Sequence, residues 1–156
     1  MPANHRRWYA VSMRIRRLNH CVYQTQYHIV WTTKYRRKLI IEVVKTEIIK
    51  HIYKIEHTYQ DWHIVSVNTD IDHVHLVIEF PPIYTIAAVV QKLKANTSLY
   101  IQKRFAFIKR IYAKNGGLWS VGYFASTVGL NEATIKRYVE RQGTYDRGQT
   151  INDEFE

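Results

Sequence analysis

Two histidines, His73 and His75, stand two positions apart in the stretch NTDIDHVHLVIEF, residues 68–80. Side chains alternate between the two faces of a β-strand, so both imidazoles lie on one face. The other face carries the apolar residues Val74, Leu76, Ile78 and Phe80. Two imidazoles at this spacing on an open sheet face can bind one metal ion. Two surface histidines without a function fit the same pattern, because short motifs produce many false matches.

A two-histidine metal site needs a third ligand and a reacting group, and the segment IKRYVERQ offers both. Tyr138 and Gln142 are four residues apart, so they share one face of a helix. Tyr138 also belongs to a stripe with Ile135 and Val139, which is equally typical of a tyrosine packed in a core. Spacing alone leaves both interpretations open.

The composition limits the class of protein. The chain has 156 residues, which is enough for one compact domain and short for two. Apolar residues make up 46%, so a real core is expected rather than global disorder. The single cysteine, Cys21, excludes an internal disulfide and a cysteine-based zinc site. No apolar run approaches the roughly 18 residues of a membrane helix, and no signal peptide is visible. We therefore expect a cytoplasmic protein with no membrane partner.

The charge balance points to a polyanionic partner. Twenty-three Lys and Arg residues against thirteen Asp and Glu residues give a net charge of +10. This excess suits nucleic acid better than a membrane surface. A small protein that is merely basic would show the same balance. Twelve tyrosines add aromatic rings that could stack on unpaired bases, although most of them are expected in the core.

Hydrophobic periodicity predicts the element order β-α-β-β-α-β followed by a short helix. Strands are expected over residues 21–31, 62–69, 73–80 and 122–129, with a basic loop at 34–38. Helices are expected over residues 41–59, 85–104 and 132–142, the last capped by Asn131 and ended by Gly143. This order is the ferredoxin-like, RRM-like α+β pattern. Both long helices would cover one face of an antiparallel sheet and leave the other face open.

The two ends of the chain look different from this domain. Residues 1–20 contain five arginines and no acidic residue, which predicts a mobile basic arm. We place residues 1–12 outside the domain, a single domain at residues 13–143 and a polar tail at residues 144–156. Met13 is an alternative to Met1 as the natural start.

From about residue 13 to residue 142, the chain resembles the single-tyrosine, single-strand DNA transposases of the insertion sequence 200/605 family, which belong to the HUH nucleases. HCVYQTQYHIVWTTKYRRK resembles the opening strand and loop of that family, and DHVHLVIEF resembles its HUH strand. GLWSVGYFASTVGLNEATIKRYVERQG resembles its closing strand and tyrosine helix. Three blocks in the family order are far more specific than His-x-His alone. The resemblance does not extend to residues 1–12 or to the last dozen residues.

The resemblance implies roles for individual residues. Tyr138 would attack a DNA phosphate, form a 5′-phosphotyrosine link and free a 3′-hydroxyl. His73, His75 and Gln142 would bind Mg²⁺ or Mn²⁺. Free tyrosine has a pKa near 10, so the metal or another cation must help it lose its proton. Asp70 and Asp72 flank the histidines, and their contact with the metal is left open.

The resemblance also implies partners. Family members recognise hairpins at the ends of the element as single-stranded DNA. They form homodimers in which the tyrosine helix of one subunit can complete the HUH site of the other, and Gly129 could serve as the mobile joint. Candidate DNA contacts lie in the first loop, the second helix and the arm: Lys34, Arg36, Arg37, Lys92, Lys94, Arg14, Arg16 and Arg17. For each of them separately, a solvated surface charge is the ordinary alternative.

Two other functions compete with a transposase. HUH replication initiators, plasmid relaxases and domesticated nucleases use similar sites, but the chain lacks a helicase domain and has one tyrosine rather than a neighbouring pair. A non-catalytic RRM-like module would share the fold. The usual RNP1 signature of such modules is missing from the sequence. Metal-dependent DNA cleavage would separate an enzyme from a binding module.

Overall fold

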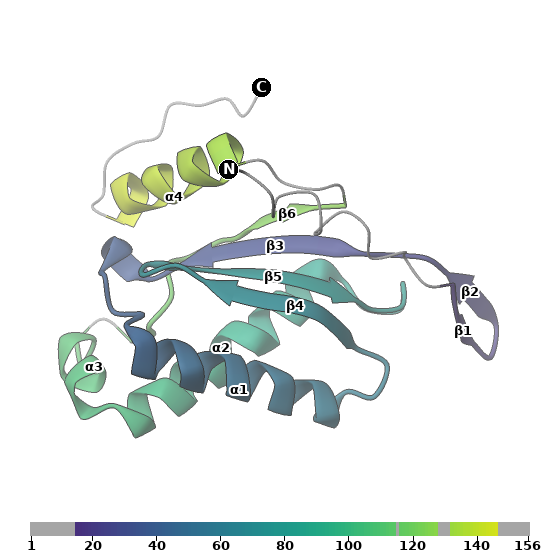
Figure 1. Ribbon diagram of the computed structural model, residues 1–156, viewed down its shortest axis with the longest axis horizontal. Helices are drawn as coiled ribbons and strands as arrows, with labels where there is room; N and C mark the ends of the chain where they lie inside the picture. Colours follow the sequence, from purple (N-terminus) through teal and green to yellow (C-terminus); the bar gives the residue numbers. More distant parts are fainter. Residues whose placement is uncertain (1–14, 115, 128–131, 147–156) are drawn as a thin grey trace, which may run out of the picture.

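The computed structural model describes residues 15–114, 116–127 and 132–146. Within these residues the main sheet is antiparallel, in the order β4 (His63–Thr69), β5 (His73–Glu79), β3 (Tyr27–Thr32) and β6 (Phe124–Ser126). Helices α1 (Glu42–Thr58) and α2 (Ile86–Arg104) lie against one face, and α4 (Glu132–Asp146) lies over the other (Figure 1). The predicted ferredoxin-like α+β fold with an additional tyrosine-bearing helix is confirmed.

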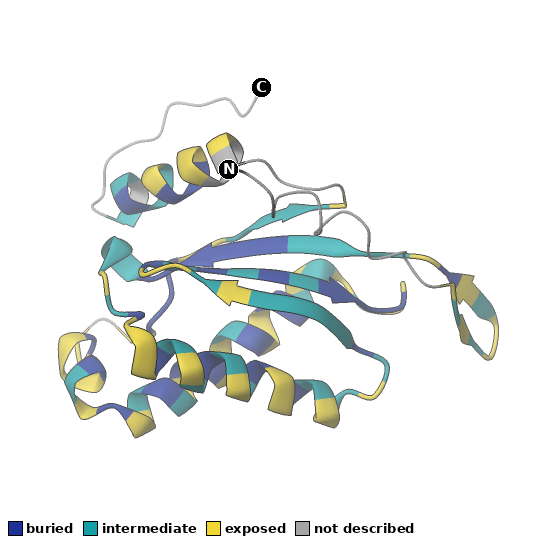
Figure 2. Cartoon of the chain, in the orientation of Figure 1, coloured by how far each residue is buried: buried dark blue, intermediate teal, exposed yellow. Residues whose placement is uncertain are grey.

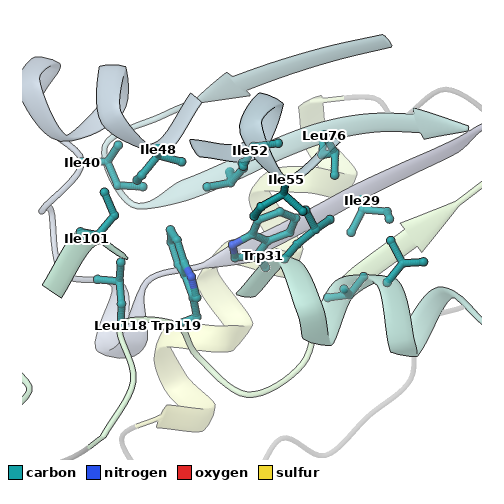
Figure 3. Packing of buried hydrophobic residues seen from close by; sticks show 14 of the residues in the cluster. Ile29, Trp31, Ile40, Ile48, Ile52, Ile55, Leu76, Ile101, Leu118 and Trp119 are labelled. Atoms are coloured by element: carbon teal, nitrogen blue, oxygen red, sulfur yellow. The ribbon is translucent and has the colours of Figure 1, made fainter. Parts of the chain in front are cut away.

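The core lies between the sheet and the pair α1 and α2. Side chains that face the sheet are buried, whereas the outer sides of both helices are exposed (Figure 2). Ile48 and Ile52 of α1 belong to the same hydrophobic cluster as Leu76 of β5 and Trp31 of β3, and all four are fully buried (Figure 3). Burying each such side chain stabilises the fold by about 1.5–3 kcal/mol. This face therefore supplies most of the stability.

Helices α1 and α2 and strands β4 and β5 begin and end within one residue of their predicted bounds. Thr85 precedes α2, and its side-chain oxygen accepts a hydrogen bond from the backbone N–H of Ala88 at 3.1 Å. This is an N-cap, which satisfies one of the unpaired donors at a helix start. In the part of the chain that the structure describes, none of the helices combines the length and apolar character needed to cross a bilayer.

The N-terminal prediction is wrong in two respects. Residues 16–20 do not belong to a mobile arm, because β1 (Arg16–Leu18) pairs with β2 (Cys21–Tyr23) in a separate hairpin. The predicted strand over residues 21–31 is also two strands, β2 and β3. The Nε atom of Arg16 lies 2.8 Å from Glu79, and the hydroxyl of Thr25 donates to the carbonyl of Phe80 at 2.7 Å. These contacts bind the hairpin to the end of β5. Residues 1–14, including Arg14, lie outside the described residues.

The C-terminal half contains further differences. A 3₁₀ turn, η1 (Lys34–Arg36), stands in the predicted basic loop, and a short helix, α3 (Ala106–Ile111), was not predicted. The predicted end of the last helix at residue 142 is wrong, because α4 continues to Asp146. Gly143 does not end it but lies buried against Arg36, so packing holds the helix past the glycine. Strand β6 is shorter than predicted, and Gly129 and Asn131 lie outside the described residues.

Candidate active site

The paired histidines lie on the face of the sheet that α1 and α2 do not cover. Along β5 the even-numbered apolar residues are buried, whereas His73 and His75 are half-buried on the opposite side, so the predicted alternation is confirmed. His28 shares this face, because its strand partner is Val77. Burial, followed by the charges of His28 and His73, lowers the pKa of His75 to about 4. His75 is therefore neutral at pH 7, which is the form that binds a metal.

Asp72 holds His73 in place. Its Oδ1 atom lies 2.9 Å from His73 Nδ1, and its Oδ2 atom lies 3.4 Å from Arg36 Nε. Burial acts to raise the pKa of Asp72, but the hydrogen bond to His73 and the charges of His73 and Arg36 outweigh it, so the pKa is lowered. A carboxylate on Nδ1 orients the imidazole and leaves Nε2 for a ligand. Asp70 instead accepts a hydrogen bond from the N–H of Ile71 at 2.7 Å.

Tyr138 lies on α4 and packs over β3, the strand next to the histidine strand. Its ring packs against Val30, Val139 and Phe124, with the centroid of the Phe124 ring 5.7 Å away. Val30 is the strand partner of His75, so Tyr138 packs on the strand that neighbours the histidine strand. The hydroxyl is buried and has no hydrogen-bond partner among the described residues. Burial, and then the charge of Asp146, raises its pKa.

Tyr138 therefore combines both interpretations: its ring packs as a core residue, and its hydroxyl has the surroundings of a reacting group. The ring is 5% exposed and packs as a core residue does. A buried hydroxyl without a partner costs about 1–3 kcal/mol, so a tyrosine with a purely structural role is poorly placed here. Unsatisfied buried polar groups call for an explanation, and a catalytic role is one of the explanations.

Gln142 and Tyr138 converge on Gly122, as their four-residue spacing predicts. A Cβ atom at Gly122 would lie 3.5 Å from the Gln142 side-chain amide and 4.0 Å from the Tyr138 hydroxyl. Gly122 has φ +96°, a conformation that favours glycine. The Gln142 amide also contacts the Ser120 hydroxyl at 2.8 Å. Ser120 donates its backbone N–H to Thr32, the strand partner of His73, so the amide and the histidines belong to neighbouring segments.

The side chains gathered here offer ligand atoms that suit a divalent cation. Among the described residues, no three His, Cys, Asp or Glu side chains gather as ligands, so a third protein ligand would have to be of another type. The amide of Gln142 is such a donor. The Nε2 atom of His75 is buried with no hydrogen-bond partner in the described part of the chain, and His73 is oriented by Asp72. An orphaned imidazole nitrogen beside an oriented imidazole fits a metal ligand pair.

Most of the predicted DNA-contacting residues have their charged groups engaged within the protein. Arg37 lies over the rings of Tyr35 and Tyr112, with centroid distances of 5.0 and 4.9 Å. The ammonium of Lys94 donates to the carbonyls of Ser120 at 2.7 Å and Gly122 at 2.9 Å. The Lys94 ammonium therefore supports the segment on which Tyr138 and Gln142 converge.

The remaining candidates are more varied. Lys92 lies 4.8 Å from the ring centroid of Tyr59, and Lys34 lies 5.8 Å from that of Tyr35. Arg16 and Arg36 form the ion pairs described above, whereas Arg17 is exposed on the outer hairpin. A contact of any of these side chains with DNA stays a prediction.

Sequence reasoning did not identify Ser120, Gly122, Asp146 or His28 as neighbours of the site. His28 could have been found only from the pairing of β3 with β5, which depends on strand order. Asp146 lies eight residues after Tyr138, on the same helical face, but the predicted helix ended too early to include it.

Comparison with known proteins identifies the class to which the chain is similar, the transposases, which are DNA-processing enzymes. A family model described as "Transposase IS200 like" matches residues 21–142, which include both histidines, Tyr138 and Gln142. The chain belongs to this IS200-like transposase family. This finding favours the transposase over the initiator and the RRM-like binding module.

Individual relatives agree with the family match. The transposase for insertion sequence element IS200 of Salmonella typhimurium is 30% identical over 130 residues, which cover 83% of this chain and 84% of that protein. The ISDra2 transposase TnpA of Deinococcus radiodurans is 29% identical over 124 residues, with coverages of 78% and 86%. A crystal structure of a candidate transposase from Deinococcus radiodurans R1 superimposes with a TM-score of 0.74 at 27% identity, covering 82% of this chain and 98% of that one.

Proposed function

We propose that this transposase cleaves and rejoins single-stranded DNA at the ends of an insertion sequence, with Tyr138 as the nucleophile. The position of the Tyr138 hydroxyl carries the proposal. It is buried without a partner among the described residues, and it belongs to a side chain that packs on Val30, the strand partner of His75. A reactive group held beside two candidate metal ligands is the arrangement that phosphoryl transfer needs.

The chemistry requires one bond to form and one to break. The Tyr138 oxygen bonds to the phosphorus of a DNA phosphodiester, while the bond from phosphorus to the 3′ oxygen breaks. The leaving oxygen becomes a 3′-hydroxyl, which accounts for the proton that Tyr138 gives up. The resulting 5′-phosphotyrosine keeps the free energy of the phosphodiester, so a later attack by a 3′-hydroxyl rejoins DNA without ATP.

His73, His75 and Gln142 would hold a Mg²⁺ or Mn²⁺ ion. When bound, such an ion neutralises charge on the phosphate and favours the ionised form of an attacking hydroxyl. Imidazole and amide ligands suit Mn²⁺ better than Mg²⁺, which prefers carboxylates and water. Asp72 would keep His73 oriented, and the depressed pKa of His75 would keep that imidazole neutral.

Access to Tyr138 requires α4 to shift. With only 5% of the side chain exposed, a DNA phosphate cannot reach its hydroxyl in the arrangement described. A helix that leaves its own sheet could return to it or dock on a second copy. The proposal includes a homodimer in which active sites are shared between subunits, acting on hairpins at the ends of the element.

The experiment uses single-stranded oligonucleotides that cover both flanks of the gene, incubated with purified protein and Mn²⁺ and resolved on a denaturing gel. We expect a slow covalent band that needs Mn²⁺ and is lost in Tyr138→Phe and His73→Ala. Tyr53→Phe is the matched control, because Tyr53 is an exposed tyrosine on α1, across the sheet from the site. An adduct formed by Tyr138→Phe would overturn the proposal. Native-gel shifts without any covalent band in either metal would indicate a binding module.

A further inference from the structure

The Ser120 hydroxyl stands between two acceptors on α4. Its Oγ atom lies 2.8 Å from Gln142 Oε1 and 2.6 Å from Asp146 Oδ1. A serine hydroxyl carries one proton and so donates one hydrogen bond, whereas an ionised carboxylate can only accept. The Ser120 proton is therefore committed to Asp146, which is the shorter of the two contacts.

Because the Ser120 proton points to Asp146, it determines which way the Gln142 amide faces. An amide oxygen 2.8 Å from Ser120 Oγ would set lone pairs against lone pairs once the proton points to Asp146. The oxygen and nitrogen of a side-chain amide are assigned from their hydrogen-bond network. Turning the amide by about 180° lets its NH₂ group donate to Ser120. The carbonyl oxygen then occupies the outward position beside Gly122, toward which the Tyr138 hydroxyl also points.

Asp146 and Ser120, which form a hydrogen-bonded relay to Gln142, are both anchored to the body of the protein. The Oδ2 atom of Asp146 accepts a hydrogen bond from the backbone N–H of Tyr35 at 2.8 Å. The backbone of Ser120 donates to the carbonyl of Thr32 at 2.9 Å, and its own carbonyl accepts from Lys94 at 2.7 Å. The direction of the amide is therefore imposed by η1 and by the segment before β6, not by α4 alone.

We propose that Asp146 and Ser120 are positioning residues that hold the Gln142 amide with its oxygen turned outward, available to a divalent cation. The proposal rests on the function proposed above, because it gives the amide its use. Tyr138, Gln142 and Asp146 follow each other at four-residue intervals, so one helical face carries the nucleophile, the ligand and the residue that orients the ligand. Without the relay the amide can present its nitrogen, which cannot bind a cation.

The direction of the amide can be measured without metal. In a ¹⁵N-edited NOESY spectrum, the side-chain NH₂ of Gln142, assigned by its loss in Gln142→Glu, should show contacts to the Hβ protons of Ser120. In Asp146→Ala the Ser120 proton is released to the amide oxygen, so the NH₂ contacts should move to the Hα protons of Gly122. Contacts to Gly122 in the wild-type protein would overturn the proposal.

Mn²⁺ affinity gives the second readout, followed by the relaxation of water protons during titration of the protein. Ser120→Ala should weaken Mn²⁺ binding by about 10–100-fold, as loss of a residue that orients a ligand commonly does. Adding Gln142→Glu should restore binding, because a carboxylate presents an oxygen whichever way it turns. Ser66→Ala is the matched control, since Ser66 lies on the same sheet face opposite Val77, and the hydrogen bonds of Gln142 and Asp146 described above do not involve it. Unchanged affinity in Ser120→Ala, or no recovery in the double variant, would overturn the proposal.

The two proposals fail in different ways. Covalent adducts that need Mn²⁺, together with unchanged Mn²⁺ affinity in Ser120→Ala, would remove the positioning role and keep the transposition chemistry. A wild-type protein that binds no Mn²⁺ and forms no adduct would overturn both. A circular dichroism spectrum of each variant separates loss of binding from loss of fold.

Discussion

The two faces of the main sheet are covered in opposite ways. On one face α1 and α2 bury a continuous apolar layer, in which Ile29, Trp31 and Leu76 have no exposed surface. On the other face α4 rests on a small cluster of Val30, Tyr138 and Val139, with Phe124 at its edge. The same face also carries His28, His73 and His75, with Glu79 hydrogen-bonded to Arg16 and Gln26.

This difference means that one face of the sheet provides most of the stability and the other carries the candidate site. A large apolar interface opens only with the whole fold, whereas an element with few apolar contacts opens at a lower free energy. The face under α1 and α2 therefore behaves as a scaffold. The face under α4 is expected to lose its cover without unfolding of the domain, and the proposed role of Tyr138 requires this opening.

Tyr138→Phe is expected to give the largest contrast between loss of activity and change in stability. Covalent adduct formation should fall by at least about 1000-fold, as removal of a nucleophile commonly does. The free energy of unfolding should stay the same or rise by about 1 kcal/mol, because the substitution removes a buried hydroxyl that has no partner among the described residues. Urea denaturation followed by circular dichroism checks this. A loss of more than about 1 kcal/mol would mean that the hydroxyl has a structural role.

A matched pair of truncations compares the two faces directly. Ile52→Ala removes a fully buried side chain from the scaffold face and should lower the free energy of unfolding by about 3 kcal/mol. Val139→Ala should leave global unfolding within about 1 kcal/mol and mainly speed hydrogen exchange of the α4 amides. Denaturant titration and amide exchange on both proteins test the comparison. Equal global losses would show that α4 unfolds together with the scaffold.

Gly143→Ala should loosen α4 alone. A Cβ atom there would lie 2.4 Å from Arg36 Cδ and 2.9 Å from Cγ, so the arginine or the helix must move. We expect a cost of about 1–3 kcal/mol in the docking of α4, as for overpacking elsewhere. This outweighs the gain of about 1 kcal/mol from better helix propensity. Amide exchange of α4 measures it.

A double-mutant cycle tests the cause of that loss. Arg36→Ala removes the side chain that the new Cβ atom of Gly143→Ala would meet, so the losses of the two substitutions should not add in the double variant. Additive losses would show that the cost of Gly143→Ala does not arise from its contact with Arg36.

The smallest expected effect is a change in how the free energy of unfolding depends on pH, caused by His51 on the scaffold face. Burial, followed by the charge of Lys54, lowers the pKa of His51, which stacks on Tyr100 with ring centroids 4.2 Å apart. The unfolded chain therefore takes up a proton first as the pH falls below about 6.5, and stability is lost from there downward. His51→Gln should show a flatter fall between pH 7 and pH 5 in urea denaturation. Parallel curves would contradict this assignment.

Much of the scaffold could be predicted because its signals are local. The stripe of Val44, Ile48 and Ile52 repeats at helical spacing, and β5 alternates at a period of two, so each segment shows its own type and its buried side. The hairpin of residues 16–23 could not be predicted in the same way. It depends on Arg16 meeting Glu79, 63 residues further along the chain.

The sequence by itself determined the residue types and spacings of the site: two imidazoles on one strand face, and Tyr138 and Gln142 on one helix face. Those relations lie within single elements, where backbone geometry dictates the direction of each side chain. Only the tertiary structure decided that α4 covers β3 beside His75, and that Ser120 and Asp146 meet at the Gln142 amide. Such contacts depend on which surfaces bury each other, and the partners lie too far apart in the chain for any local pattern to record them.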